Sequence, residues 1–518
     1  MKRILTATFI CISLISNGQS TISGLVKDTK NSPLKGVSLS IKDSYDGAIT
    51  DSAGKFSFKT SEKGEQILIV SAIGYKSWEQ KLNLPANYTS ININLKEEIN
   101  ELKAVVITAG SFEAGDRKKG TVLTTLDILT TASANADVTA AIKTLPGAQQ
   151  VGESEGLFVR GGTATETKIF IDGTLVNNFF YSSVPDVAQR GRFSPFIFKG
   201  TVFSAGGYSA LYGQALSSAL ILESIDLPEI SSANLGVSPI GLSGGIQELS
   251  KNKKWSWGAS YSYTNVDLAF KVLKTSLDYF TIPEYHTGDA NFRIKTSKTG
   301  MFKYYGYFST NRLGLRRSSL DSIGYKEAFV LKNFNMYHNV SWKENIGKGW
   351  RVNAGASYSN NIDHINGNMQ DGQNNETTLA GLEYKNFFLH TRDQYFNAKV
   401  VLEKRIAGLN TMRFGGEYNY SNEHFYYTIN NGQQFDYPVI EKLKAAFAET
   451  DIYITNNLAA KLGARFENSS LLNKSNLAPR ISIAYKLGKE SQASLAYGSF
   501  YQNPETKYLP AVNPLIFS

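Results

Sequence analysis

The 518-residue sequence has one cysteine, 13 prolines and no long apolar run after its first residues. The cysteine, Cys11, lies inside an apolar stretch near the N-terminus, so the rest of the chain has no thiol for disulfides or thiolate metal sites. A mean hydropathy of -0.23, without a later apolar run of about 18 residues, excludes a bundle of transmembrane helices. A membrane barrel is not excluded, because its strands alternate apolar and polar residues.

The residues that are abundant favour strands joined by turns, since the chain has 28 Tyr, 29 Phe and 44 Gly. Its length exceeds what one hydrophobic core organises, so we expect several domains. The net charge is +9, but the Lys and Arg are spread among polar strand positions without a dense basic run. We therefore expect no nucleic-acid partner and interpret these charged strand positions as facing a solvated lumen. In an exported protein, positive loops would also meet anionic lipid headgroups.

The N-terminus is typical of a secretory signal. Lys2 and Arg3 precede an apolar stretch over 4–15 and the small-residue sequence Ser-Asn-Gly at 16–18. We predict a signal peptide over 1–18 and a mature chain that begins near Gln19. The alternative is a short buried helix, but no capped amphipathic pattern follows it. No lipobox precedes Cys11, so a lipid anchor is not expected.

Residues 20–95 form short alternating runs separated by Gly, Pro, Asn and Asp, which predicts a small β-sandwich. The turn chemistry of Asp51 and Gly54 places Phe56 and Phe58 on one strand face. The runs PLKGV at 33–37, TDSAGKFSF at 50–58 and IGY at 73–75 resemble the carboxypeptidase regulatory-like domain, a transthyretin-like sandwich, which we assign to 19–97. The strands expected here are 21–27, 37–41, 55–59, 66–72 and 90–95.

No pattern in the sequence predicts catalysis or a metal. A GxSxG match at 241–245 lies in a strand-like run and lacks the strand-turn-helix context of a nucleophile elbow. None of the histidines begins an HxxE or HExxH arrangement, so we expect them on the surface or in a lumen, with no metal site, no cofactor and no enzyme activity. These histidines are His286, His338, His364, His390 and His424.

A linker over 98–112 contains a short β-prone strand beside polar sequence, as a donor segment for strand addition requires. It resembles the TonB box, and the resemblance implies pairing with a TonB-like periplasmic energy-coupling protein. The alternative is an ordinary terminal strand of the sandwich. The residues of this candidate are Ala104, Val105, Val106, Ile107, Thr108 and Ala109.

Residues 113–226 combine a helix predicted over 136–145, ended by Pro146-Gly147, with three motifs: LFVRGG at 157–162, IFIDG at 169–173 and YSALYGQAL at 208–216. From the residues alone they predict an α/β globule. In this order they resemble the plug domain of TonB-dependent receptors. The chain departs from that family at 217–221, where SSALI replaces a strand of the Gly-Gly-Val-Ile kind. The plug-motif residues are Arg160, Gly161, Gly162, Asp172, Gly173, Tyr212 and Gly213.

Residues 230–518 alternate with period 2, for example around Trp257 and Phe466, which predicts antiparallel strands with one apolar face and one small or charged face. A soluble sandwich would have shorter strands. Short connections at 346–349 and 487–491 alternate with long polar ones at 266–288, 361–395 and 428–441, as in periplasmic turns and extracellular loops. About twelve strands are expected, against the 22 of plugged transporters, so we interpret the barrel as truncated. A smaller complete barrel would leave little room for a plug.

Together these patterns predict a mainly β protein: an N-terminal β-sandwich, a small α/β plug and an incomplete antiparallel transmembrane β-barrel. The resemblance implies an exported, multi-pass receptor of the outer membrane, in contact with its lipid. It would import an extracellular small ligand, such as a siderophore–iron complex, cobalamin or an oligomeric nutrient, by energised transport. The alternatives are a non-transporting surface receptor or adhesin and, third, a passive porin.

Overall fold

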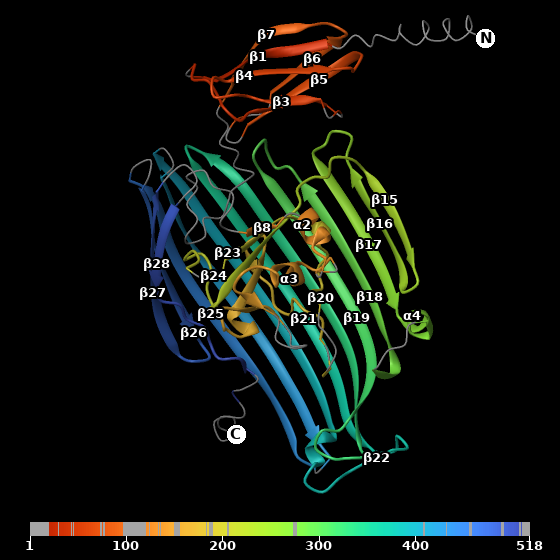
Figure 1. Cartoon of the computed structure of the whole chain (residues 1–518). Coiled ribbons are helices and arrows are strands. Elements are labelled where there is room, and N and C mark those ends of the chain that lie inside the picture. The colour runs from red at the N-terminus through yellow and green to blue at the C-terminus, as the bar shows by residue number, and fades with distance from the viewer. Residues whose placement is uncertain are drawn as a thin grey trace, which may run out of the picture. The chain divides into compact units, whose positions relative to one another are not determined.

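A computed structural model gives the fold of the chain (Figure 1). It describes residues 20–96, 121–506 and 509, apart from gaps at 30, 43, 45, 73–74, 76–77, 124, 133, 135, 150–155, 183, 186–189, 205–206, 273–276, 408–409, 431, 455–457, 488–491 and 507–508. The chain divides into two units, Met1–Val106 and Ile107–Ser518. The predicted signal peptide and the candidate strand from Ala104 to Ala109 lie outside the described residues.

The first unit is a sandwich of two sheets, with strand orders β4-β1-β7 and β3-β2-β5-β6. Phe56 and Phe58 both point into the core, as predicted, where they join Ile22, Leu68 and other buried side chains. Asp51 Oδ1 accepts hydrogen bonds from the backbone N–H of Ala53 and Lys55, which closes the turn before them. The strands are β1 (Ser20–Asp28), β2 (Ser38–Ile41), β3 (Gly47–Ile49), β4 (Lys55–Thr60), β5 (Gly64–Ser71), β6 (Trp78–Leu84) and β7 (Tyr88–Leu95).

The second unit begins with a plug, whose main sheet has the order β12-β11-β14-β13-β8. Asp137 caps α3 by accepting from the backbone N–H of Thr139 and Ala140, and this helix is shorter than the predicted 136–145. The elements of the plug are β8 (Thr121–Leu123), α2 (Thr125–Thr130), α3 (Val138–Ile142), β9 (Ala148–Gln149), β10 (Phe158–Val159), η2 (Ala164–Glu166), β11 (Thr167–Ile171), β12 (Thr174–Leu175), η3 (Pro195–Ile197), β13 (Phe198–Ser204) and β14 (Ser218–Ser224).

A 14-stranded antiparallel sheet follows, in chain order from β15 to β28, with β22 paired only to β21. Fourteen strands less the short β22 leave thirteen, close to the twelve or so expected. The strands are β15 (Ser232–Ser238), β16 (Gly241–Leu249), β17 (Trp255–Asn265), β18 (Asp278–Ile294), β19 (Met301–Ser318), β20 (Lys326–Gly347), β21 (Trp350–Gln370), β22 (Glu376–Thr377), β23 (Phe387–Ala407), β24 (Asn410–Ile429), β25 (Gln434–Tyr453), β26 (Leu458–Ser469), β27 (Lys474–Lys486) and β28 (Gln492–Gly498); α4 (Asp267–Val272) and η4 (Glu383–Lys385) lie in connections.

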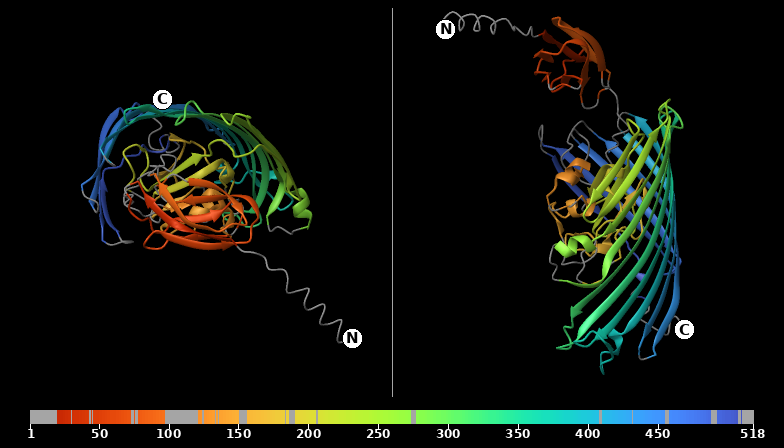
Figure 2. Two further views of the ribbon diagram at one scale, coloured as in Figure 1. Left: turned by 90° about the horizontal axis from the view of Figure 1, so that it is seen from above. Right: turned by 90° about the vertical axis from the view of Figure 1, so that its right-hand side faces the viewer.

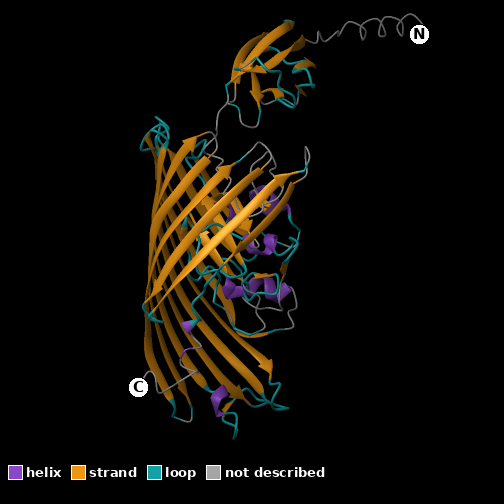
Figure 3. Ribbon diagram, turned by 90° about the vertical axis from the view of Figure 1, so that its left-hand side faces the viewer, coloured by secondary structure: helices purple, strands orange, loops and turns teal. Residues whose placement is uncertain are grey.

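The long sheet curves around the plug, which lies against its concave side (Figure 2). The short helices of the plug lie beside the long strands in Figure 3. Plug and sheet share one hydrophobic core, because Phe193 of the plug packs on Tyr305, Tyr307 and Tyr337 of the sheet. The opposite, convex side carries exposed apolar residues such as Trp257, 40% exposed, as the predicted alternation requires.

The predicted long loops are shorter than expected. β18 begins at Asp278, and β21 and β23 leave only 371–386 between them. The third expected loop is a connection of residues 430–433 between β24 and β25. The strands project beyond the plug at this end (Figure 1). There apolar and polar residues occur on both faces, with Leu313 and Leu331 buried on one side and Phe334 exposed on the other, so the two-faced alternation that marks a strand is weak.

No helix among the described residues is long and apolar enough to cross a membrane.

Candidate functional site

The first plug motif forms a tight turn after β10. Arg160 and Gly161 have φ of 52° and 82°, in the left-handed region where glycine is favoured. Gly162 allows a close approach, because a Cβ added there would lie 2.6 Å from the Cβ of Ser217. Ser217 precedes β14, so the serines that replace glycine at 217–218 are accommodated beside Gly162 and the strand is kept.

The second motif closes the hairpin between β11 and β12. Asp172, with φ of 49°, and Gly173, with φ of 92°, form its turn. The buried Asp172 carboxylate accepts a 3.0 Å hydrogen bond from the backbone N–H of Ser224 and another from the Ser224 hydroxyl. The motif thereby ties the hairpin to the end of β14.

Beside Asp172, two lysines of the sheet form ion pairs with carboxylates at the end of β14 and just after it. We call these residues, Lys303, Lys343, Glu223 and Asp226, the lysine cluster. Lys303 Nζ lies 2.8 Å from Asp226, and Lys343 Nζ lies 2.8 Å from Glu223. Burial alone would raise the pKa of Asp226, but Lys303 and the plug's own Lys199 outweigh it and lower this pKa to about 2. The pKa values of Asp172 and Glu223 are also lowered, because burial is outweighed by the same lysine charges.

The lysine cluster predicts that acid loosens the plug. Because the pKa of Asp226 is depressed on folding, its stabilising contribution is present above about pH 4, the unfolded pKa, and is lost as pH falls toward about 2. We expect pepsin to cleave the plug faster, relative to a peptide substrate, as pH falls from 4 to 2. In Asp226→Asn, which removes this titration, the change with pH should be smaller; an unchanged pH profile would contradict the assignment.

A second contact joins the plug to the neighbouring strands through Arg192. This side chain is 5% exposed, and Nη1 donates to Ser309 Oγ at 2.9 Å and to Asn333 Oδ1 at 3.1 Å. Nη2 donates to Asn361 Oδ1 at 3.3 Å, while Nε donates to carbonyl groups of the plug itself. One guanidinium therefore bridges the plug and three adjacent strands, β19 to β21.

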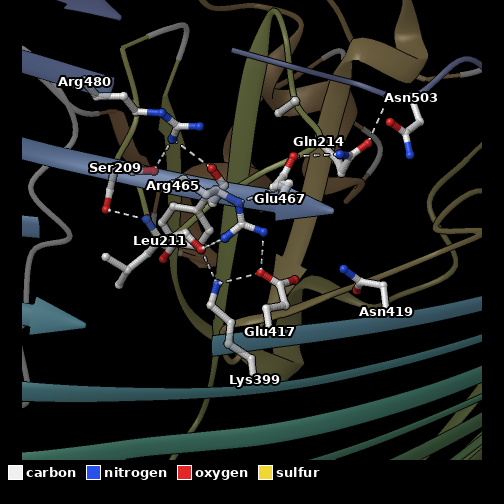
Figure 4. A network of polar contacts seen from close by, with 12 residues as sticks. Ser209, Leu211, Gln214, Lys399, Glu417, Asn419, Arg465, Glu467, Arg480 and Asn503 are labelled. Carbon is white, nitrogen blue, oxygen red and sulfur yellow. Dashed lines mark hydrogen bonds and ion pairs between the residues drawn. The ribbon is translucent and has the colours of Figure 1, made fainter. Parts of the chain in front are cut away.

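The third motif lies against β23 to β27, and we call this the 208–214 contact (Figure 4). Arg480 Nη1 donates to the carbonyl oxygen of Tyr212 at 2.8 Å, and Lys399 Nζ donates to that of Leu211. In the other direction, the backbone N–H of Ala210 donates to Glu449 Oε2 at 2.8 Å. The charged concave side of β23 to β27, which we call the wall, thus binds the backbone of the motif. The centre of the Tyr212 ring lies 4.7 Å from Lys399 Nζ.

Behind this contact the wall holds buried ion pairs. Arg465 is 1% exposed, and its Nη2 lies 2.9 Å from Glu417 and its Nε 2.6 Å from Glu467. Gly213 lies directly on these groups, since an added Cβ would overlap Arg465 and Glu467. Gln214 Nε2 completes the contact by donating to Glu467 Oε2 at 2.9 Å.

The segment after β28 adds a bridge between the plug and the wall. The backbone N–H of Asn503 donates to Gln214 Oε1 at 2.9 Å, and Gln502 Nε2 donates to the carbonyl of Thr165 at 2.9 Å. On the other side, Asn503 Nδ2 donates to Ser469 Oγ at 3.1 Å. The segment is therefore held at the third motif and at η2, which follows the first motif.

The structure brings the three motifs together around β14, but their partners in the sheet were not predicted from the sequence. Charged residues in the strands were interpreted as facing a solvated lumen, whereas Arg465 and Glu449 are at most 3% exposed and contact the plug. Asp451 is buried among charged residues of the sheet itself. The available signal was the density of charge on the small-residue face of β26, at Lys461, Arg465 and Glu467. The GxSxG match proves to lie within β16, where Ser243 is paired to strands on both sides.

Comparison with known proteins agrees with this architecture. Residues 22–107 match the CarboxypepD_reg-like domain family. Residues 256–517, just over half of the chain, match the TonB dependent receptor-like β-barrel family. The domain limits predicted from the sequence stay predictions.

Relatives of known identity cover the chain in part. TonB-dependent receptor SusC of Bacteroides thetaiotaomicron is 27% identical over 236 residues, which are 42% of this chain but 22% of SusC. The solved ferric enterobactin receptor PfeA of Pseudomonas aeruginosa has a TM-score of 0.55 at 14% identity, over 77% of this chain and 64% of that one. The alcaligin receptor FauA of Bordetella pertussis has a TM-score of 0.55 at 11% identity, over 76% and 64%. The fold and the family match together establish that this chain belongs to the TonB-dependent receptor family of the outer membrane.

Proposed function

We propose that this protein imports a scarce extracellular ligand through the outer membrane, with energy delivered by a TonB-like protein of the periplasm. Receptors of this family bind extracellular ligands and interact with TonB. The observation that carries the proposal is the plug itself, which lies on the concave side of the sheet and is attached through the lysine cluster, Arg192 and the 208–214 contact. A passive pore has no need of a plug attached in this way.

These attachments are polar and replaceable, which suits a plug that rearranges. Hydrogen bonds with charged groups contribute about 1.5–3 kcal/mol each. Each contact therefore holds the plug against thermal motion but can be broken when a force is applied to the plug. We infer that the strand Ala104 to Ala109 pairs with the coupling protein by strand addition and that pulling on it strains the plug. The parts of the plug that this strain deforms would then include the turns and contacts formed by the plug motif residues Arg160, Gly161, Gly162, Asp172, Gly173, Tyr212 and Gly213.

Transport rather than catalysis is the activity we infer, since the family consists of transport receptors. Siderophore–iron complexes are the first ligand class to test, because solved relatives are named as receptors for ferric enterobactin and alcaligin. Cobalamin and oligosaccharides are the next classes. The membrane lipid and an extracellular small ligand are thus the further partners proposed.

Deleting residues 104–109 tests the function. Cells that express the full chain would be given radiolabelled ferric enterobactin, cobalamin or maltoheptaose, and both surface binding and accumulation would be measured. We expect the deletion to reduce accumulation of the ligand that is bound to the background of cells without the chain, while surface binding persists. The matched control removes six residues at 111–116, outside the candidate strand.

Accumulation that survives the deletion of 104–109 would refute energised import through this strand. Binding without accumulation by the intact chain would favour a surface receptor that does not transport. Steady conductance of the intact chain in a planar bilayer would favour a passive pore.

A further inference from the structure

The convex face of β20 to β25 carries aromatic and basic side chains near the strand ends that are joined by the longer connections. Asn333, Asn361 and Glu417 lie on the concave side, in or beside the plug contacts. Since successive side chains of a strand alternate between faces, their sequence neighbours point away from the plug. Even-numbered residues of β20, β21, β23, β24 and β25 therefore form the convex face.

An aromatic row crosses this face. The register places His338, Tyr358, Phe396 and Tyr420 side by side on four successive strands. Phe396 is 36% exposed, and exposed Val340 and Val400 lie on the side nearer to the short turns. Aromatic rows beside an apolar band mark the interface of a membrane-spanning barrel, so this row places the outer edge of the hydrocarbon layer.

Three cations flank the aromatic row. Lys442 is the cross-strand neighbour of Tyr420, and Lys444 that of Tyr418. Arg392 lies on the same strand as Phe396, four residues closer to the longer connections. Four residues span about 14 Å along the strand, which is roughly 10 Å in height for a strand tilted by about 40°. That height matches the headgroup layer, which is about 5–8 Å thick, within the reach of a long side chain.

The charges of these three side chains are not compensated on the convex face. All three are exposed. Arg392 Nε donates to the neutral Asn360 Oδ1 at 3.3 Å, and within the described part of the chain no ion pair joins the three to an acid. The acid nearest to the longer connections on this face, Asp436 of β25, lies 2.6 Å from His424. Farther along the sheet, Glu284 of β18 lies 2.5 Å from Arg312.

We propose that Arg392, Lys442 and Lys444 form a docking surface for the phosphate groups of lipid headgroups in the outer leaflet. Lys442 and Lys444 extend from the level of the aromatic row to the headgroup layer, and Arg392 meets the same layer from outside. A guanidinium binds two phosphate oxygens at once, and ammonium groups add point charges beside it. The position next to the aromatic row favours a lipid over a soluble anion, which would not be held at the membrane surface.

The test uses the purified full chain in detergent micelles and lipid A as the probe. Native mass spectrometry would measure its apparent Kd for lipid A with both phosphates and for dephosphorylated lipid A. Each Lys or Arg near a headgroup contributes roughly a fivefold factor, so the triple variant R392Q/K442Q/K444Q should bind phosphorylated lipid A at least about tenfold more weakly. The control K251Q/K254Q/K298Q removes the same charge from exposed turns at the other end of the strands and should change the Kd less than about twofold.

The proposal is overturned if the triple variant binds within twofold of the unmodified chain, if the control loses as much, or if dephosphorylated lipid A binds equally well. Circular dichroism would establish that the variants keep their strands. Should the triple variant misfold, R392Q alone is expected to weaken binding severalfold and R392K to retain it. Equal binding by R392Q and the unmodified chain would refute the role of Arg392.

Discussion

Replacing Arg465 by alanine is expected to lower the free energy of unfolding by about 3–5 kcal/mol. The guanidinium is 1% exposed and lies between Glu417 and Glu467, which are themselves buried. Without it, two carboxylates remain in the interior with neutral hydrogen-bond donors from Asn397 and Gln214. Among the described residues the ion-pair partner left to them is Lys399, whose Nζ is 3.8 Å from Glu417. The measurement is a urea titration of the full chain in detergent micelles, followed by circular dichroism.

Arg312→Ala is the matched control. Arg312 also forms an ion pair in the sheet, 2.5 Å from Glu284, but its side chain is 61% exposed. Such exposed pairs contribute about 0–1 kcal/mol, so the two variants should differ clearly. Similar losses in both would mean that the Arg465 cluster is hydrated and not a buried part of the interface between the plug and the wall.

Substituting Gly213 by alanine is expected to cost about 1–3 kcal/mol and to weaken the hold of the wall on the plug. The added Cβ would overlap the Arg465 guanidinium and Glu467 Oε1. Long side chains usually move aside cheaply, but these two are confined by burial and by their mutual bond at 2.6 Å. Proteolysis of the plug by trypsin in detergent measures this effect separately from unfolding of the sheet.

Gly200→Ala provides the control within the same domain, because nothing lies within 4 Å of a Cβ added there. Combining Gly213→Ala with Arg465→Ala then tests the mechanism. If the alanine acts by displacing the guanidinium, its cost should shrink in the Arg465→Ala background. Strictly additive costs would show that Gly213 is needed for another reason, such as the backbone of the 208–214 contact.

The sequence was sufficient for the parts of the fold that local patterns determine. The turn at Gly54 and the alternation around Phe56 and Phe58 predicted a strand of the sandwich, and the alternation around Trp257 predicted a two-faced strand. Turn residues and period-2 patterns act over a few positions, so one sequence carries them. The same patterns weakened beyond the membrane layer, where apolar and polar residues occur on both faces of a strand, and the third expected loop was a hairpin.

The partners of the plug could not be predicted in this way. Arg192 meets Asn361 across 169 positions of sequence, and Arg465 meets the loop at Leu211 across 254. A charged residue on the concave face looks the same in sequence whether water or a plug covers it. The motif residues were found because they shape local turns; their contacts depend on the docking of two domains, which no local spacing encodes.

The end of β14 has a mechanical consequence. The chain leaves the plug at Ser224 and enters the sheet at Ser232, and within this short connection Asp226 is bonded to Lys303. The ion pair holds the connection at β19, whereas the chain itself joins the sheet at its edge strand β15. A plug displaced from the 208–214 contact would therefore stay tethered to the sheet by both the chain and this ion pair.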